Sequence, residues 1–275
     1  MEILPNIHRV AIGKPNIKGL YPPNVYMILG ERVAIIDTGY NQSHDINTRS
    51  VYLGGLGDPE VQTIILTHRH IDHAGGAASL HRKTKAPIVA HVEEKPFIED
   101  QLEGLKLHHT VDDNETINIG NFTLQIIHTP GHTMGSICVL IQEIGVLFTG
   151  DTIMGFGTSV INPGEGDMGL FLDSLNKLLQ FDCNTILPGH GNPVPDPKSK
   201  IQELIEHRLD REHKMLQFLG KKKRKINDFL KEFYIKPGIN PELHDMARNQ
   251  IKAHLNKLES ENKVEHLGKD SYSLL

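Results

Sequence analysis

Apolar residues in the first 190 positions gather into short runs that predict strands joined by turns. The runs are rich in β-branched residues and too short for helices. Gly120-Asn121 and Gly145 each separate two such runs, which indicates two hairpins. Helical spacing of apolar residues alternates with these runs, so two sheets with helices outside are expected. The predicted strands are 24–29, 33–36, 63–66, 88–90, 116–119, 122–127, 137–141, 146–148 and 185–187, and the predicted helices are 43–54, 75–85 and 170–179.

The pattern changes after the proline-rich stretch 193–197. A long amphipathic helix is predicted over 198–219, followed by a short helix, a longer helix and a hairpin that turns at Gly268. Two helices followed by a hairpin are typical of a winged helix. We therefore expect a catalytic domain over 1–197, a connecting helix over 198–220 and a winged-helix domain over 221–275.

Composition fits a soluble globular protein, with 38% hydrophobic and 23% charged residues in 275. No apolar run approaches the length of a membrane span, and the N-terminus lacks the pattern of a secretory leader. Cys138 and Cys183 are the only cysteines, which favours a reducing compartment. A cytoplasmic protein is the expectation.

Charge is distributed unevenly between the two parts. Residues 201–275 contain 15 lysines and arginines against 12 carboxylates, whereas residues 1–200 contain 14 against 22. The basic run 221–225 is either a solvated turn or a contact site for phosphates. The net negative charge of residues 1–200 disfavours tight nonspecific binding of nucleic acid, but bound metal ions would make the charge at their own site positive.

Potential metal ligands follow several of the predicted strands. His68, His70, Asp72 and His73 lie within six residues directly after the strand 63–66, in a chain with 17 histidines. His132, Asp151 and His190 each follow another strand and stand beside glycine, which allows tight turns. If the strand ends lie side by side, all seven residues converge at one rim. Taken singly, each has an ordinary interpretation as a surface, structural or capping residue, but the full set predicts a site for zinc.

This set, with Asp37 in Ile36-Asp-Thr-Gly39, looks like the signature of the metallo-β-lactamase superfamily. The resemblance implies an αβ/βα four-layer sandwich with two Zn²⁺ ions per chain, Mn²⁺ and Fe²⁺ being alternatives. It also implies the role of each residue. The first metal would be held by His68, His70 and His132, and the second by Asp72, His73 and His190. Asp151 would bridge both metals. Asp37 would support the loop that carries the ligands, or would be a plain turn residue at the end of a strand.

Two divalent ions close together can share a hydroxide and stabilise the oxyanion that its attack creates. Asp72 is the expected catalytic side chain, which would orient this hydroxide or relay its proton.

Further characteristic positions are Asn24 and Tyr26 near the start of the chain, Thr158 after Asp151, and the pair His207-Arg208. With these, the chain is similar over most of its length to the β-lactamase-like-protein-2 family, and the resemblance implies endoribonuclease activity on single-stranded RNA and the C-terminal winged helix. The matching positions give the substrate-binding candidates Asn24, Tyr26, Thr158, His207 and Arg208. The segment 157–166 departs from the family pattern where it is expected to border the metals, which leaves the substrate open.

Three functions therefore compete. The favoured function is a zinc phosphodiesterase that acts on RNA. The second is a thioesterase of the hydroxyacylglutathione type or a lactonase, which would use the same hydroxide on a small ester or thioester. A nucleic-acid-binding regulator is disfavoured because the ligand set is unbroken. No membrane partner is expected, and a homodimer is left open.

Overall fold

Two sheets form the centre of the first part of the chain in the computed structural model, which describes residues 1–13 and 21–275. The larger sheet has seven strands in sequence order, antiparallel from β1 to β4 and parallel from β4 to β7. The smaller has the order β12-β11-β10-β9-β8, in which only β11 and β12 pair in parallel. The strands of the larger sheet are β1 (Glu2–Leu4), β2 (Ile7–Ala11), β3 (Asn24–Leu29), β4 (Val33–Ile36), β5 (Val61–Ile65), β6 (Ile88–His91) and β7 (His109–Val111). Those of the smaller are β8 (Thr116–Asn118), β9 (Thr123–His128), β10 (Ile137–Ile141), β11 (Val146–Gly150) and β12 (Thr185–Pro188).

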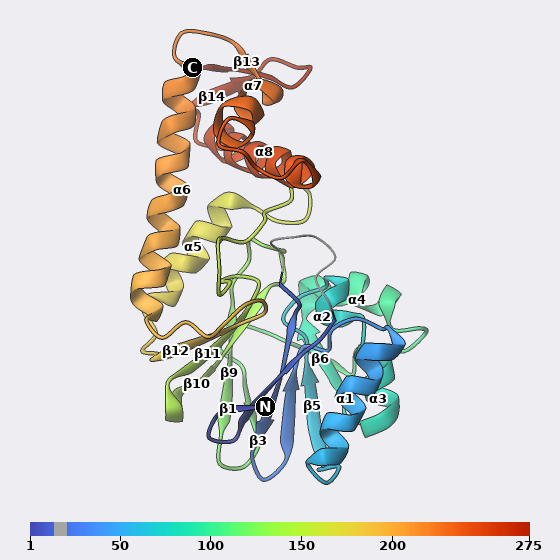
Figure 1. Ribbon diagram of the computed structural model, residues 1–275. Coiled ribbons are helices and arrows are strands. Elements are labelled where there is room, and N and C mark those ends of the chain that lie inside the picture. Colours follow the sequence, from blue (N-terminus) through green and yellow to red (C-terminus); the bar gives the residue numbers. More distant parts are fainter. Residues whose placement is uncertain (14–20) are drawn as a thin grey trace. The chain divides into compact units, whose positions relative to one another are not determined.

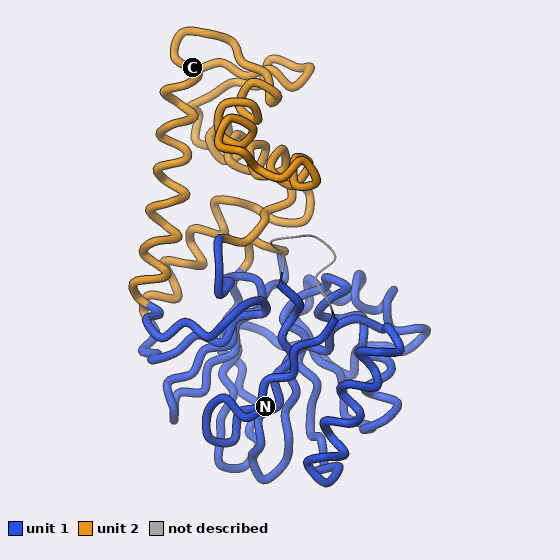
Figure 2. The backbone as a smooth tube through the Cα atoms, viewed as in Figure 1, with its two compact units in different colours: residues 1–129, 134–157, 181–197 blue, residues 130–133, 158–180, 198–275 orange. Residues whose placement is uncertain are grey.

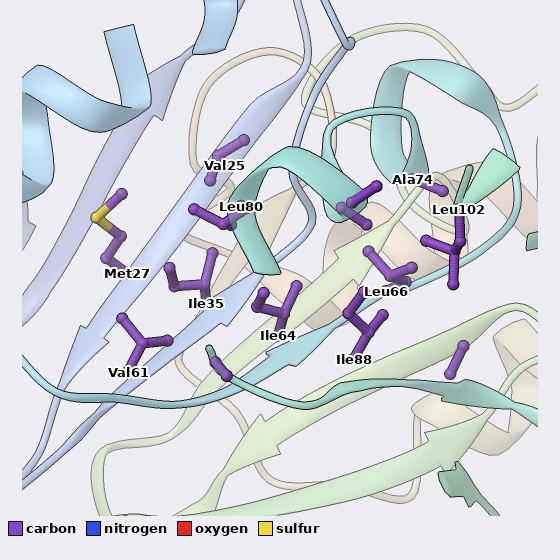
Figure 3. Packing of buried hydrophobic residues seen from close by; sticks show 14 of the residues in the cluster. Val25, Met27, Ile35, Val61, Ile64, Leu66, Ala74, Leu80, Ile88 and Leu102 are labelled. Carbon is purple, nitrogen blue, oxygen red and sulfur yellow. The ribbon is translucent and has the colours of Figure 1, made fainter. Parts of the chain in front are cut away.

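Helices cover the outer face of the larger sheet, where Figure 1 shows them gathered on one side. They are α1 (Ser43–Gly55), α2 (Ile71–Ala74), α3 (Ala77–Thr84) and α4 (Lys95–Gln101), with a short 3₁₀ helix (Val92–Glu94) directly before α4. Another 3₁₀ helix (Gln142–Ile144) connects β10 and β11 of the smaller sheet. Side chains of the strands, including Met27, Ile35 and Ile64, pack there against Leu80 and Leu102 of the helical layer (Figure 3). Because alternate strand residues face opposite sides, the neighbouring positions fill a second core.

That second core lies between the two sheets. Ile28 and Ile36 of the larger sheet belong to one buried cluster with Ile126, Val139 and Phe148 of the smaller sheet. Strands buried on both faces read as continuous apolar runs, which is why the sequence predicts them well. The neighbouring parallel strands β4 and β5 have their carboxyl-terminal ends side by side in the larger sheet, as β11 and β12 do in the smaller sheet. Polar residues follow all four strand ends.

The chain divides into two compact units, coloured separately in Figure 2. The first comprises residues 1–129, 134–157 and 181–197, and the second comprises 130–133, 158–180 and 198–275. The predicted boundary at residue 197 stays a prediction, but the contacts group 130–133 and 158–180 with the C-terminal part.

The second unit contains the helices and the small sheet of a winged helix. Its core includes Met215 and Leu219 from the end of α6, together with Phe229, Leu255 and Tyr272. Its small sheet has the order β13-β15-β14. Its elements are α5 (Met168–Leu178), α6 (Pro197–Leu219), β13 (Arg224–Lys225), α7 (Ile226–Leu230), a π-helical turn (Lys231–Ile235), a 3₁₀ turn (Pro241–Leu243), α8 (His244–Ser260), β14 (Val264–His266) and β15 (Ser271–Leu274).

The predicted helix over 75–85 begins differently in the structure. α2 and α3 are separated at Gly75 and Gly76, and a Cβ at Gly76 would lie within 2.6–2.8 Å of the Arg49 guanidinium. The buried arginine therefore requires glycine at this break. None of the helices within residues 1–13 and 21–275 is long and apolar enough to cross a membrane.

Candidate metal centre

The carboxylate of Asp37 holds the loop that carries four of the predicted ligands. Asp37 follows β4, is 2% exposed and has a φ of 59°. Its Oδ1 accepts the backbone N–H of Thr67 at 2.8 Å. Its Oδ2 accepts the Thr67 hydroxyl at 2.8 Å and lies 2.7 Å from Nδ1 of His73. One buried carboxylate thus joins both ends of the segment 67–73.

His68 and His70 lie together at the beginning of this loop. The Thr67 hydroxyl donates to Asp37, so its oxygen can accept from Nδ1 of His68, 3.0 Å away. This arrangement leaves Nε2 of a neutral His68 with the lone pair. That atom is 3.1 Å from Nδ1 of His70.

His73, His190, Asp72 and Asp151 form a second group. Nδ1 of His190 donates to the carbonyl oxygen of Tyr21 at 2.8 Å. The Nε2 atoms of His73 and His190 face one another at 3.2 Å. Oδ1 of Asp151 is 3.3 Å from Nε2 of His73, and Oδ2 of Asp72 is 3.2 Å from Nε2 of His190. The polar edges of the two sheets therefore meet at this group.

The charges of this group perturb one another. Burial by itself lowers the pKa of His73, but Asp151, Asp72 and Asp37 outweigh it and raise that pKa well above its usual value. The pKa of His190 is likewise raised by Asp151 and Asp72 against the effect of burial. Burial by itself raises the pKa of Asp151, whereas His190 and His73 hold it well below the usual range. Protons on the histidines compensate the buried carboxylates when no metal ion does so.

This donor set fits divalent metal ions. Because Nδ1 of His73 and of His190 is used by Asp37 and Tyr21, two neutral rings would point lone pairs at each other, which requires a cation or a proton between them. Two nitrogens bound to one tetrahedral zinc at about 2.0 Å lie about 3.3 Å apart, close to the spacing here. Metal-binding histidines typically donate their other ring N–H to a carboxylate or carbonyl, as these two do. Two groups in this unit have ligand atoms within 4.8 Å of one another: His68, His73 and Asp151, and Asp72, His73 and His190.

His132 lies in the segment Pro130–Thr133, which belongs to the second unit. Its Nδ1 is 2.7 Å from the carbonyl oxygen of Val160 and 3.0 Å from Oγ of Ser159. Its role as a ligand of the first metal stays a prediction.

Three of the predicted substrate-binding residues lie in the second unit. Arg208 is 2% exposed and donates to Oγ1 of Thr158 at 2.6 Å. Burial lowers the pKa of Arg208 to about 10. His207 is exposed on α6, and desolvation, together with the charges of Arg208 and Arg211, lowers its pKa. Thr158 and Arg208 thus contact each other, and this burial disfavours a direct contact of Arg208 with substrate.

The other two, Asn24 and Tyr26, are buried beside the turn that carries His190. The Asn24 amide donates to the carbonyl oxygens of Pro188 and Gly191, both at 2.9 Å, and the Tyr26 hydroxyl donates to that of Pro188 at 2.8 Å. Burial raises the pKa of Tyr26, so it stays a neutral donor. These side chains position the turn 188–191; substrate contact by them stays a prediction that their burial disfavours.

Comparison with known proteins agrees with this geometry. The family model described as the metallo-beta-lactamase superfamily matches residues 19–190. The chain belongs to the metallo-β-lactamase superfamily. A second model, the beta-lactamase associated winged helix domain, matches residues 235–271 and confirms the predicted C-terminal module.

Two named relatives match most of the chain. A protein of Drosophila melanogaster named "Beta-lactamase-like protein 2 homolog" is 31% identical over 96% of this chain and 94% of its own length, which confirms the resemblance drawn from the sequence. The "Atrochrysone carboxyl ACP thioesterase AacuM" of Aspergillus aculeatus is 29% identical over 80% of this chain and 67% of its own length.

Solved structures confirm the predicted fold class. A metallo-beta-lactamase family protein from Thermus thermophilus matches with a TM-score of 0.82 at 22% identity, with 100% of both chains covered. A beta-lactamase domain protein from Burkholderia ambifaria matches with a TM-score of 0.88 at 17% identity, covering 100% of this chain and 93% of its own. At these identities the likeness concerns the metallo-β-lactamase fold alone.

Some residues that build this metallo-β-lactamase site carry no recognisable signal in the sequence. Glu94 is fully buried, and its two carboxylate oxygens accept the backbone N–H groups of Arg69 at 2.9 Å and of Gly135 at 2.8 Å. The Gln101 amide donates to the carbonyl oxygen of Arg69 at 2.7 Å. These contacts fix the backbone between His68 and His70.

Changing Asp37→Asn should weaken metal binding about 10- to 100-fold without unfolding the protein. Asparagine tolerates the left-handed backbone, but its side chain has an NH₂ group in place of one carboxylate oxygen. An NH₂ group cannot accept a hydrogen bond, so the contacts to Thr67 and His73 cannot all be kept. Competition with a chromogenic chelator measures the affinity. Asp58→Asn makes the same change at an exposed left-handed position and should have no effect. Equal affinities for both variants would contradict the role of Asp37.

Metal binding should release protons and weaken as the pH falls. His73 and His190, whose pKa values are raised, hold protons that a metal ion must displace, so affinity should rise with pH through the usual histidine range and above it. Calorimetry in buffers of different ionisation enthalpy measures the protons released, and elemental analysis should find about two ions per chain. A pH-independent affinity without proton release would disagree with this site.

Proposed function

We propose that the protein is a dinuclear zinc hydrolase whose substrate is single-stranded RNA, cleaved as by an endoribonuclease. The observation that carries the hydrolase assignment is the paired arrangement of His73 and His190 with Asp72 and Asp151 at the shared sheet edge. The superfamily membership supports a hydrolase in general, and the identity of the metals and of the substrate is our proposal.

The residues divide between two metal positions as the resemblance implies. His68, His70 and His132 would hold one ion, Asp72, His73 and His190 the other, and Asp151 both. Two bound zinc ions would supply a water of lowered pKa and stabilise the negative charge that develops on the substrate. The same ligand types also accept Mn²⁺ or Fe²⁺.

Asp72 is the side chain best suited to handle a proton. It belongs to α2, and its side chain is 22% exposed, in contrast to the fully buried His73. Burial by itself raises the pKa of Asp72, but His73 and His190 lower it below the usual value. The carboxylate is therefore ionised at neutral pH and reachable by water, so it can accept a proton from the attacking water.

The RNA assignment is supported by the length of the family likeness and by charge. The relative named beta-lactamase-like protein 2 homolog aligns through the winged helix as well as the catalytic part. Lys221, Lys222 and Lys223 are exposed at the turn between α6 and β13. Cations in this position can displace the counterions of an RNA backbone.

A thioesterase is the second candidate. The thioesterase relative from Aspergillus aculeatus matches 80% of this chain, and the same hydrolytic centre would act on a thioester. Labelled single-stranded RNA and an acyl thioester should therefore be tested side by side with the metal-loaded full chain. RNA cleavage is the expected result, whereas thioester hydrolysis alone would favour the second candidate.

Changing Asp72→Asn should lower turnover by about two orders of magnitude or more while the fold stays intact. The substitution keeps the volume but removes the ionised oxygen that accepts the proton. Initial rates at matched metal content give the effect. Asp100→Asn makes the same chemical change on an exposed position of α4 and should retain wild-type turnover. Near wild-type turnover of Asp72→Asn would refute the assigned role.

Replacing Lys221, Lys222 and Lys223 together by Ser should weaken RNA binding and make its salt dependence shallower, by a slope of about 2 if three phosphate contacts are lost. Hydrolysis of a small thioester should change less than about twofold, since it needs only the metal centre. Binding titrations at several salt concentrations provide the slope.

The matched control replaces Lys83, Lys85 and Lys106, which are exposed or nearly so in the first unit. A shallower slope for this control as well would mean that overall charge, not the basic run, is responsible. Truncation of the tail is a poorer test, because Gln250 of α8 bonds the carbonyl oxygen of Ser159 beside His132.

A further inference from the structure

A short loop, residues 158–160, contacts the ring of His132 within the second unit. Its Nδ1 contacts the Val160 carbonyl oxygen at 2.7 Å and Oγ of Ser159 at 3.0 Å. A carbonyl oxygen only accepts, so Nδ1 carries the proton and Nε2 is the nitrogen that would bind a metal ion. The position of Ser159 and Val160 therefore helps to set the direction in which Nε2 of His132 points.

The backbone around His132 leaves little room for adjustment. A Cβ at Gly131, whose φ is 142°, would lie 2.3 Å from Cα of Phe171. A Cβ at Gly166 would lie 2.5 Å from the carbonyl oxygen of His132 itself. The backbone is thus packed on both of these sides, and the contacts to Ser159 and Val160 restrict rotation of the ring.

Two buried side chains fix that loop in turn. Nη2 of Arg208 donates to Oγ1 of Thr158 at 2.6 Å and to the carbonyl oxygen of Ser159 at 2.5 Å. Nη1 of Arg208 donates to Oε1 of Gln250 at 2.9 Å, and the Gln250 amide donates to the same Ser159 oxygen at 3.1 Å. Two donors on one carbonyl fix the peptide plane between Ser159 and Val160.

We propose that Arg208, supported by Gln250, is a positioning residue for the metal ligand His132. The inference rests on the metal centre of the proposed function. It assigns to α6 and α8 a task in the catalytic site: the guanidinium holds the 158–160 loop, and the loop holds the imidazole. Arg208 is 2% exposed and Gln250 is 7% exposed, so both are committed to contacts inside their own unit.

The test measures metal binding by the full-length protein loaded with Co²⁺, whose visible spectrum reports the ligand set. Arg208→Met keeps the length of the side chain but removes all of its donors. It should weaken binding at one of the two sites about 10- to 100-fold, the range seen for groups that orient metal-binding histidines, and should change the spectrum as His132→Ala does. Arg208→Lys, which keeps one donor, should recover part of the affinity.

Arg211→Met is the matched control. Arg211 lies on the same helix, with its guanidinium 4.8 Å from the ring centre of Tyr234 and 5.4 Å from that of Phe233, and should leave affinity and spectrum unchanged. The double variant of Arg208→Met and His132→Ala should bind metal within about twofold of His132→Ala alone, because residues that act through one contact are not additive.

A purely structural role would give different results. If Arg208→Met lowers the melting temperature but leaves affinity and spectrum as in the wild type, or weakens binding equally when His132 is absent, the inference is wrong. If Arg208→Met does not fold, Gln250→Leu, which keeps the arginine, should produce the same spectral change to a smaller extent, and an unchanged spectrum would reject the inference. Wild-type protein that binds no metal would instead overturn the proposed function.

Discussion

The metal loop depends on one buried carboxylate, that of Asp37. It accepts from the backbone and the side chain of Thr67 and from the ring of His73, six residues further on. Through the Thr67 hydroxyl it also reaches the ring of His68. A single anion therefore sets the tautomers of two histidines and the curvature of the loop between them. The left-handed conformation of Asp37 is the local cost of placing a carboxylate directly at the end of a buried parallel strand.

Much of the fold could be predicted because its central strands are buried on both faces. Strands β3 and β4 agree with the predicted bounds, since continuous apolar runs have few alternatives. Strands β1, β2 and β7 were not predicted. β1 and β7 have three residues each, with exposed positions, and β2 has five residues with the polar pair His8 and Arg9 among them, so none shows a clear pattern.

Residue type and glycine neighbours indicated the predicted ligands and, through the family resemblance, Asp37, whereas the other groups that orient the ligands carried no signal in the sequence. The carbonyl oxygen of Tyr21 can hold the ring of His190 whatever the side chain at that position is, so no sequence pattern marks it. Glu94 acts on a loop 25 positions away, at Arg69, and that proximity exists only in the folded chain. Groups that hold the metal ligands in this way come from distant parts of the chain, so the spacing of residues in the sequence does not predict them.

The electrostatics of the site explain why such a group persists in a folded protein. Burying ions without partners is strongly unfavourable, and replacing a buried ion pair by apolar residues often stabilises a protein. His73 is fully buried among three carboxylates, and the opposite shifts in the pKa of His73 and of Asp151 show how strongly each depends on the other's charge. Packing alone gives no reason to place these groups together. A site that binds divalent cations does, because the ions supply the positive charge that the histidines otherwise provide by protonation. Asp37 and the carbonyl oxygen of Tyr21 hold the rings of His73 and His190 by their other nitrogens, so the two Nε2 atoms stay directed at one another whether a proton or a metal ion lies between them.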